Sequence, residues 1–221
     1  MSISENVIAI QREIPAGVLL IAVSKTKPVS LVEEAYQAGQ RAFGENYVQE
    51  LVEKQPQLPA DIDWHFIGHL QSNKVKYIAP FVHWIHGVDS FKLLKEISKQ
   101  AVKNGRTIQC LLQVHIASED TKFGFSPEEL RIASTVYNPN DYPGVELSGL
   151  MGMASFTEDE SQIRSEFKSL KTLFDELKSG AFCGLTSFTE LSMGMSSDRT
   201  IAIEEGSTMI RVGSSIFGSR N

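Results

Sequence analysis

The chain has few of the features that mark membrane, secreted and fibrous proteins. Its longest apolar run, residues 18–23, is far shorter than the roughly 20 residues needed to cross a bilayer. The amino-terminal residues lack the basic region and long apolar core of a secretory signal. Neither a low-complexity tract nor a solenoid repeat interrupts the chain. We therefore expect a cytoplasmic globular protein with no membrane contact.

Cysteine is also scarce. The only two cysteines, Cys110 and Cys183, lie far apart and within or beside apolar stretches instead of forming a C-x-x-C pair. This placement predicts two buried thiols in a reducing compartment. His83 and His86 flank two apolar residues with no acidic residue beside them, so we expect no metal site there.

The chain has no excess of positive charge. It contains 21 lysines and arginines against 27 aspartates and glutamates, which gives a net charge of −6. No overall field therefore attracts nucleic acid or anionic lipid. With 42% hydrophobic and 22% charged residues, the composition is that of an ordinary globular domain.

The chain does contain a regular alternation of short, β-branched apolar runs with longer amphipathic segments, which predicts strands and helices over a parallel sheet. An extra helix is expected first, over residues 3–13. Strands are expected at residues 17–24, 42–44, 64–68, 82–86, 107–116, 145–151, 188–192 and 208–212. Eight strand–helix units predict an α/β fold with a single (β/α)8 TIM barrel that occupies residues 1–221 as one domain.

The structural rival is a doubly wound open sheet. Such a sheet normally uses fewer units and places a G-x-G-x-x-G phosphate loop after its first strand. The turn after residue 24 has no such motif, which favours the barrel. Functional side chains of these barrels gather at the carboxyl ends of the strands, so polar residues at those positions are the candidates for a site.

Lys25 is the first of these candidates because it directly follows the apolar strand that ends at Val23 and Ser24. Desolvation at a barrel mouth lowers the pKa of a lysine and makes its amine a better nucleophile. Lys27 points to the same side of an extended chain and competes for this role. A solvated lysine at a strand end is the simpler alternative.

Small residues follow the seventh and eighth predicted strands, at residues 192–197 and 213–215. Phosphate sites of these barrels are commonly built from those two loops at a helix amino terminus. Single Gly-Ser turns are frequent, so the hypothesis depends on their coincidence at both loops. Arg211 lies inside the apolar eighth strand and needs a buried acceptor from a carboxylate, a backbone carbonyl or a ligand.

A lysine across the barrel mouth from a phosphate site suggests a ligand with a carbonyl at one end and a phosphate at the other. Pyridoxal 5′-phosphate fits this description, and so does a sugar phosphate held as a Schiff base. Arg211 discriminates only weakly between the two, because an arginine two residues before the phosphate loop can reach a pyridine nitrogen.

Several strings of residues resemble those of the pyridoxal phosphate homeostasis proteins. They occur in order at residues 22–28, 43–50, 64–74, 192–196, 211–213 and 216–218, and together they cover nearly the whole chain. The resemblance implies the fold type III barrel found in alanine racemase, without the second domain of that enzyme.

The resemblance also implies a cofactor site for pyridoxal phosphate. Lys25 would hold the cofactor as a Schiff base, and Arg211 would face the pyridine nitrogen. The implied phosphate ligands are Ser196, Gly213 and Ser214, and the pocket would also include Asn46 and Met195. The residue after Gly213 is a serine where many relatives have threonine, and the hydroxyl is kept.

Binding without turnover is the function we expect. An arginine against the ring nitrogen keeps that nitrogen unprotonated and weakens the cofactor as an electron sink. Racemisation also needs an acid/base group on each face of the substrate carbon. The resembling racemase takes its second group from a partner's second domain, whereas this chain ends after the eighth unit. We expect a monomeric carrier or buffer of pyridoxal phosphate in vitamin B6 homeostasis, with apo-enzymes as recipients and no catalytic residues.

Three alternatives stay open at this stage. They are an amino-acid racemase that uses pyridoxal phosphate, an aldolase-like sugar phosphate barrel, and a regulatory module that senses the cofactor. The roles of His65 and Lys122 are also open, since His65 is either a core residue or a pocket neighbour. Met151 and Met153 are expected to pack in the core.

Overall fold

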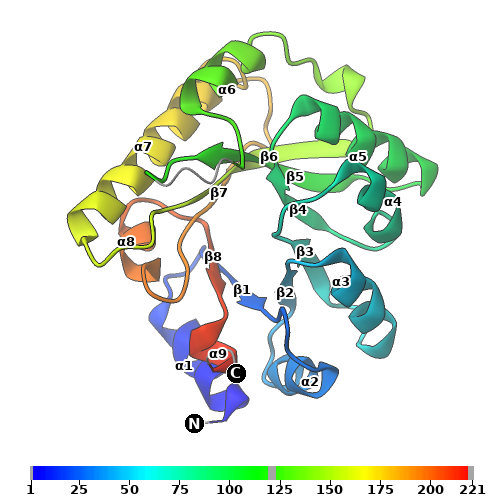
Figure 1. Ribbon diagram of the computed structural model, residues 1–221, viewed down its shortest axis with the longest axis vertical. Coiled ribbons are helices and arrows are strands. Elements are labelled where there is room, and N and C mark those ends of the chain that lie inside the picture. The colour runs from blue at the N-terminus through cyan, green and yellow to red at the C-terminus, as the bar shows by residue number, and fades with distance from the viewer. Residues whose placement is uncertain (1, 119–122, 219–221) are drawn as a thin grey trace.

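The computed structural model describes residues 2–118 and 123–218, in which a ring of parallel strands is surrounded by helices (Figure 1). The strands are β1 (Leu19–Val23), β2 (Ala42–Glu45), β3 (Asp63–Phe66), β4 (Trp84–Val88), β5 (Ile108–His115), β6 (Val145–Met153), β7 (Glu190–Ser192) and β8 (Met209–Val212). Each strand pairs with the next, and β8 pairs with β1. The closed ring confirms the predicted barrel and excludes the open sheet.

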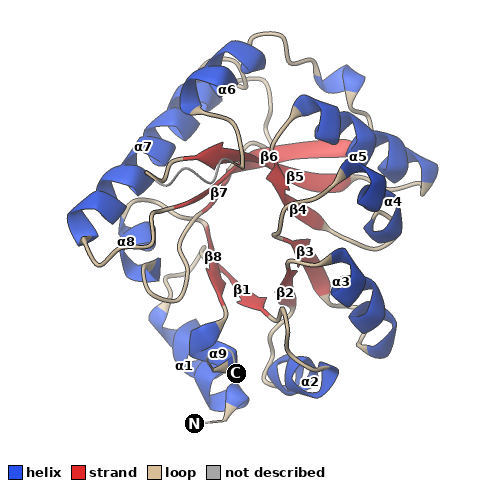
Figure 2. Cartoon of the chain, in the orientation of Figure 1, coloured by secondary structure: helices blue, strands red, loops and turns tan. Residues whose placement is uncertain are grey.

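Helices form the outer layer of the barrel, as Figure 2 shows. They are α1 (Ile3–Glu13), α2 (Val29–Gln37), α3 (Val48–Lys54), α4 (Val75–Ile78), α5 (Phe91–Lys103), α6 (Pro127–Ser134), α7 (Glu160–Ser179), α8 (Arg199–Glu204) and α9 (Ser214–Phe217), with 3-10 turns at Gln55–Gln57, Ser72–Lys74 and Pro139–Asp141. The expected extra helix is α1. It lies beside α9, where the Asn6 side chain donates to the carbonyl of Ile216 at 2.9 Å.

Side-chain caps explain where several helices begin. Ser2 and Ser126 each form a capping box with a glutamate three residues later, which satisfies backbone N–H groups at the first turn. Ser90 accepts from the N–H of Leu93 at 3.3 Å and is the cap of α5. The residue before it, Asp89, is also of a type that caps helices, but the cap of α5 is Ser90.

Alternation along the strands divides the apolar residues between two layers. Leu20 and Ala22 of β1 face the main core between the strands and the helices. Ile21 belongs to a separate cluster inside the ring, together with Leu111 and Met151. The inward-facing positions are therefore few, and those near the carboxyl ends of the strands are left for polar residues.

Three predicted details are wrong. The strand expected at residues 82–86 is observed at Trp84–Val88, because the N–H of Val82 still closes the last turn after α4 by donating to Ile78. The loop expected at residues 213–215 is already helical from Ser214. Cys183 is exposed, since the neighbouring Phe182 occupies the core position after α7. Cys110 is buried as predicted.

Within the described ranges, no helix is both long enough and apolar enough to cross a membrane. The same residues contain no group of three or more histidine, cysteine, aspartate or glutamate side chains arranged to hold a metal ion.

Candidate functional site

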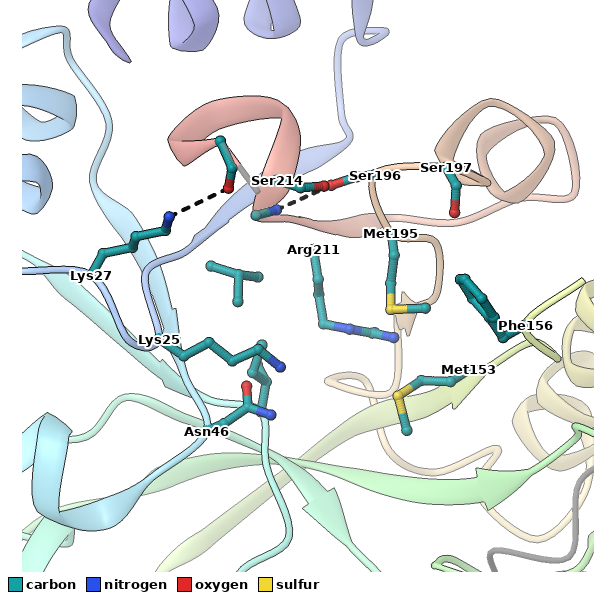
Figure 3. A pocket seen from close by; sticks show the side chains of 14 residues that line it. Lys25, Lys27, Asn46, Met153, Phe156, Met195, Ser196, Ser197, Arg211 and Ser214 are labelled. Carbon is teal, nitrogen blue, oxygen red and sulfur yellow. Dashed lines mark hydrogen bonds between the residues drawn. The ribbon is translucent and has the colours of Figure 1, made fainter. Parts of the chain in front are cut away.

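A cavity of about 350 Å³ opens at the carboxyl ends of β1 and β8 (Figure 3). Its wall consists of Val23, Lys25, Lys27, Asn46, Ile67, Met153, Phe156, Met195, Ser196, Ser197, Arg211, Gly213, Ser214 and Gly218. Every residue that sequence reasoning assigned to the site is among them. A cavity of this size is sufficient for a small organic ligand.

The two candidate lysines diverge in the cavity. Lys25 extends into its centre beside Asn46, whereas Lys27 points toward Ser214 (Figure 3). Lys27 Nζ donates to the carbonyl of Gly218 at 3.4 Å. The expectation that both lysines share one side fails because the residue between them, Thr26, has a φ of 62° and breaks the extended chain. The lysines therefore serve opposite ends of the cavity.

A buried polar cluster holds the turn that bears Lys25. We call Ser24, Glu45, Glu50 and Lys54 the Lys54 cluster. Lys54 Nζ donates to the carbonyl of Ser24 at 2.8 Å and contacts Glu45 at 2.7 Å and Glu50 at 3.3 Å. The Glu50 carboxylate accepts from the N–H of Thr26 at 2.9 Å. These bonds fix the backbone on both sides of Lys25.

The carboxyl groups of this cluster have shifted pKa values. Burial raises the pKa of Glu45 to about 7, against the opposing effects of Lys54 and Ser24. Glu45 Oε2 has no hydrogen-bond partner among the described residues, which is consistent with a carboxyl that takes up a proton readily. Although burial works against it, the hydrogen bond from Thr26 and the contacts with Glu45 and Lys54 lower the pKa of Glu50.

Backbone and hydroxyl groups after β7 and β8 lie together at the Lys27 end of the cavity. We call Ser196, Gly213 and Ser214 the Gly213 cradle. Ser196 Oγ accepts from the N–H of Gly213 at 3.3 Å. Helix α9 begins at Ser214, so the first N–H groups of the helix have no acceptor within it. A Cβ at Gly213 would lie 3.3 Å from the carbonyl oxygen of Val23, so glycine permits this close approach of β8 to β1. The cradle offers hydrogen-bond donors to an anion.

Arg211 forms the buried side of the cavity. Its side chain donates from Nη1 to Ser192 Oγ at 2.5 Å and from Nη2 to the carbonyl of Gly152 at 2.9 Å. The predicted backbone acceptor is thus present, and the serine hydroxyl is an acceptor that the sequence did not indicate. Burial lowers the pKa of Arg211 to about 10, so the guanidinium stays protonated at neutral pH.

The side of the cavity opposite Lys25 is mainly apolar, with Ser197 as a polar residue on it. Met153, Phe156 and Met195 lie there (Figure 3). Met153 is 42% exposed, so its assignment to the core is wrong, whereas Met151 is buried as expected. The reason is the position along the strand: residues two apart share a face, but Met151 is packed inside the ring, whereas Met153 lies at the last position of β6, where the wall of the cavity begins.

Comparison with known families agrees with this geometry. Residues 1–221 match the family described as alanine racemase, N-terminal domain. The chain belongs to this family. It is 39% identical to the pyridoxal phosphate homeostasis protein of Haemophilus influenzae, covering 100% of this chain and 97% of that protein. The protein of the same name from Mus musculus is 42% identical, covering 99% of this chain and 83% of that protein. The resemblance inferred from the motifs is confirmed.

Solved structures place the same barrel in this family. The structure of PipY from Synechococcus elongatus PCC7942 with PLP bound has a TM-score of 0.86 and 38% identity, covering 98% of this chain and 100% of PipY. Without PLP, PipY gives a TM-score of 0.91 at 39% identity, with the same coverage. Alanine racemase from Clostridium difficile shares the fold at 13% identity and a TM-score of 0.77, and this chain covers 56% of it.

The sequence alone did not point to some of the residues in and behind the cavity. Neither the Lys54 cluster nor Phe156 was singled out, because the sequence does not show which residues of α3 reach the turn after β1. His65 is fully buried inside the barrel and does not line the cavity, which favours the core interpretation. Lys122 lies outside the described residues.

Proposed function

We propose that this protein binds pyridoxal 5′-phosphate in the cavity and carries or buffers it without turnover, with the whole chain acting as one binding unit. A single observation is the basis of this proposal: Lys25, the Gly213 cradle and Arg211 meet in one cavity. The names of the relatives and the PLP bound to PipY support the choice of ligand.

The residues of the cavity match the chemical groups of this ligand. Lys25 supplies an amine for the aldehyde, and Arg211 supplies a cation for the side of the ring nitrogen. Asn46 Oδ1 is buried without a hydrogen-bond partner among the described residues and is an acceptor for a ligand hydroxyl. The phosphate would be held at the cradle by Ser196, Gly213 and Ser214, with Lys27 adding positive charge.

We propose that Lys25 forms a reversible Schiff base with the ligand. The unprotonated Nζ attacks the aldehyde carbon, a C=N bond replaces the C=O bond, and the oxygen leaves as water. Addition of water, or exchange with an incoming amine, reverses the bond without oxidation or reduction. This reversibility suits a carrier, because the ligand leaves by the reaction that attached it.

The wall opposite Lys25 supports binding without racemisation. Racemisation requires a proton-transfer group on each face of the substrate carbon. Among the described lining residues, Met153, Phe156, Met195 and Ser197 lie on that side, and none of these side chains is an acidic or basic group. We expect negligible deuterium exchange at Cα of free amino acids with the loaded protein. Rapid exchange would favour the racemase alternative.

The deciding experiment is an absorbance spectrum of the protein with pyridoxal phosphate, before and after borohydride reduction, followed by peptide mapping. We expect a visible band that disappears on reduction and a ligand attached to Lys25. Lys25→Ala should abolish both, whereas Lys99→Ala, at an exposed lysine of α5, should change neither. A reduced adduct on Lys27, or a stable yellow complex of Lys25→Ala, would refute Lys25 as the attachment site.

A second experiment tests the phosphate end. The double variant Ser196→Ala/Ser214→Ala should weaken pyridoxal phosphate binding by about 1–3 kcal/mol per lost hydrogen bond. Pyridoxal, which lacks the phosphate, serves as the control and should bind the variant and the wild type equally. Unchanged affinity for pyridoxal phosphate would move the phosphate site elsewhere. A colourless protein that cannot take up the ligand would favour the sugar phosphate alternative.

We also propose a monomer in the cytoplasm that delivers its ligand to apo-enzymes. Two free cysteines, one of them exposed, are consistent with a reducing compartment. Residues of a single chain supply all the cavity groups used above, so ligand binding does not depend on a second copy. Sedimentation analysis with and without ligand tests the monomer.

A further inference from the structure

A line of hydrogen-bonded side chains crosses the interior of the barrel behind the cavity. Arg211 on β8 donates to Ser192 Oγ on β7 at 2.5 Å, and this hydroxyl lies 3.0 Å from His86 Nδ1 on β4. His86 Nε2 lies 3.0 Å from His65 Nδ1 on β3, and His65 Nε2 lies 3.2 Å from Asp63 Oδ2. We call these residues the barrel chain. It runs from the cavity to the amino-terminal end of β3.

The three middle members of the barrel chain, Ser192, His86 and His65, are completely buried. The His65 ring stacks on Trp84 with an interplanar angle of 4° and a centroid distance of 5.6 Å. This stacking fixes the plane of the imidazole. Because strand backbones hold every member, the side chains have little freedom to exchange partners.

The two ends determine the direction of every hydrogen bond. A guanidinium only donates, and an ionised carboxylate only accepts. With neutral rings, Asp63 requires the proton of His65 on Nε2. His86 therefore donates from Nε2 and accepts at Nδ1 from the Ser192 hydroxyl, which itself accepts from Arg211. One arrangement with both imidazoles neutral satisfies all members.

The charges near the barrel chain agree with this arrangement. Burial, together with the neighbouring His65 and the positive charge of Arg211, lowers the pKa of His86 well below its usual value and keeps its ring neutral. Against the effect of burial, His65 and His83 lower the pKa of Asp63, which keeps it ionised. No carboxylate of the described chain forms an ion pair with Arg211, whose acceptors are a hydroxyl and a carbonyl.

We propose that Ser192 and His86 are positioning residues that lock the Arg211 guanidinium toward the ring nitrogen of the ligand. This proposal rests on the proposed function. Ser192 accepts reliably from Arg211 only because His86 takes the serine proton. Held by neutral acceptors, Arg211 keeps its full positive charge for the cavity. The barrel chain thereby favours a ligand whose ring offers an unprotonated nitrogen.

The first test needs no ligand. Nitrogen-15 NMR of labelled histidines reports which ring nitrogen carries the proton, and His65→Gln and His86→Gln assign the two signals. At neutral pH we expect both rings to be protonated on Nε2 only. A proton on His86 Nδ1, or a charged His86, would contradict the donor and acceptor roles proposed for the barrel chain. Ser192→Ala should allow His86 to carry its proton on either ring nitrogen, whereas Ser148→Ala, at a buried serine of β6 whose hydroxyl donates to the carbonyl of Glu146, should not.

The second test compares pyridoxal phosphate with its 1-deaza analogue, in which C–H replaces the ring nitrogen. Wild-type protein should prefer pyridoxal phosphate, and Ser192→Ala and His86→Leu should lose about tenfold in affinity for it while retaining affinity for the analogue. His86→Gln should retain the preference, because an amide can accept from Ser192 and donate to His65.

Equal losses for both ligands would show a merely structural role and overturn the proposal, and so would unchanged preference in Ser192→Ala. If the wild type binds neither ligand, the proposed function is wrong and the ligand-facing part of this inference falls with it. The histidine tautomers decide the barrel chain in either case.

Discussion

The two buried cations beside the cavity are held in opposite ways. Lys54, behind the turn of Lys25, contacts two carboxyl groups, Glu45 and Glu50. Arg211, on the other side, donates to the neutral Ser192 hydroxyl and to a backbone carbonyl. Both cations are almost fully buried. The same cost of removing charge from water is therefore offset by ion pairing on one side and by hydrogen bonding on the other.

This difference indicates that Lys54 has a structural role, whereas Arg211 acts on the ligand. A cation that contacts carboxylates is largely neutralised at short range and stiffens the backbone around it. A cation with uncharged acceptors keeps its field for whatever enters the cavity. The Lys54 cluster thus holds the position of Lys25, and the barrel chain leaves the charge of Arg211 available to a ligand.

Of the changes considered, replacing Lys54 should have the largest effect on stability. Lys54→Met leaves Glu45 buried without its partner and should reduce the free energy of unfolding at pH 8 by about 3–5 kcal/mol. Urea denaturation measures this loss. Lys99→Met, at a lysine whose side chain is 74% exposed, is the control and should change stability by less than about 0.5 kcal/mol.

Adding Glu45→Gln to Lys54→Met should restore much of the loss, because no buried charge is then left unpaired. A single Lys54→Met variant as stable as the wild type would mean that the ion pairs contribute nothing, and the contrast between the two sides would disappear.

The second largest effect is the pH dependence of stability that Glu45 causes in the Lys54 cluster. The pKa of Glu45 is raised to about 7 from an ordinary 4.5, so its contribution to stability is complete below pH 4.5 and is lost as the pH rises through 7. The wild type should lose up to about 3 kcal/mol relative to Glu45→Gln between pH 5 and pH 8. Unfolding free energies at intervals of one pH unit test this, and parallel curves would contradict it.

The stability contribution of His86, in the barrel chain, should depend on pH in the opposite direction. Because the pKa of His86 is lowered, its contribution is complete above pH 6.5 and is lost as the pH falls. The advantage of the wild type over His86→Gln should therefore shrink between pH 7 and pH 5. His69→Gln, at a histidine with 42% side-chain exposure, is the matched control. An advantage that grows toward acid pH would reject a neutral His86.

The smallest effect concerns the turn itself. Thr26 has a φ of 62°, which is unfavourable for a β-branched residue. Thr26→Gly should relieve this strain and raise the free energy of unfolding by no more than about 1 kcal/mol. Thr172→Gly, within α7, should instead lower it by about 0.3–0.5 kcal/mol. A clear loss of stability in Thr26→Gly would show that the threonine conformation is not strained.

Local signals in the sequence were sufficient for the barrel. The alternation of apolar and amphipathic segments predicts the order of β1 to β8, and serines with a glutamate three residues later mark the starts of α1 and α6. The place of Lys25 after β1 follows from the same pattern. Each of these features depends on residues that are neighbours in the chain.

Contacts between distant residues were beyond the reach of the sequence. Ser192 and His86 are 106 positions apart, and their contact depends on the register of strands that do not follow one another. The different directions of Lys25 and Lys27 depend on the conformation of Thr26 alone. Periodicity likewise cannot tell that Phe182 instead of Cys183 enters the core.

The pairing of β1 with β8 also determines when the cavity can exist during folding. Lys25 follows the first strand and the Gly213 cradle follows the last, so the two come together only at the seam where the sheet joins itself. Contacts of such sequence separation are the slowest to form. A ligand that contacts residues after both strands would stabilise the pairing of β1 with β8. The amide hydrogens of these strands would then exchange more slowly in the loaded protein.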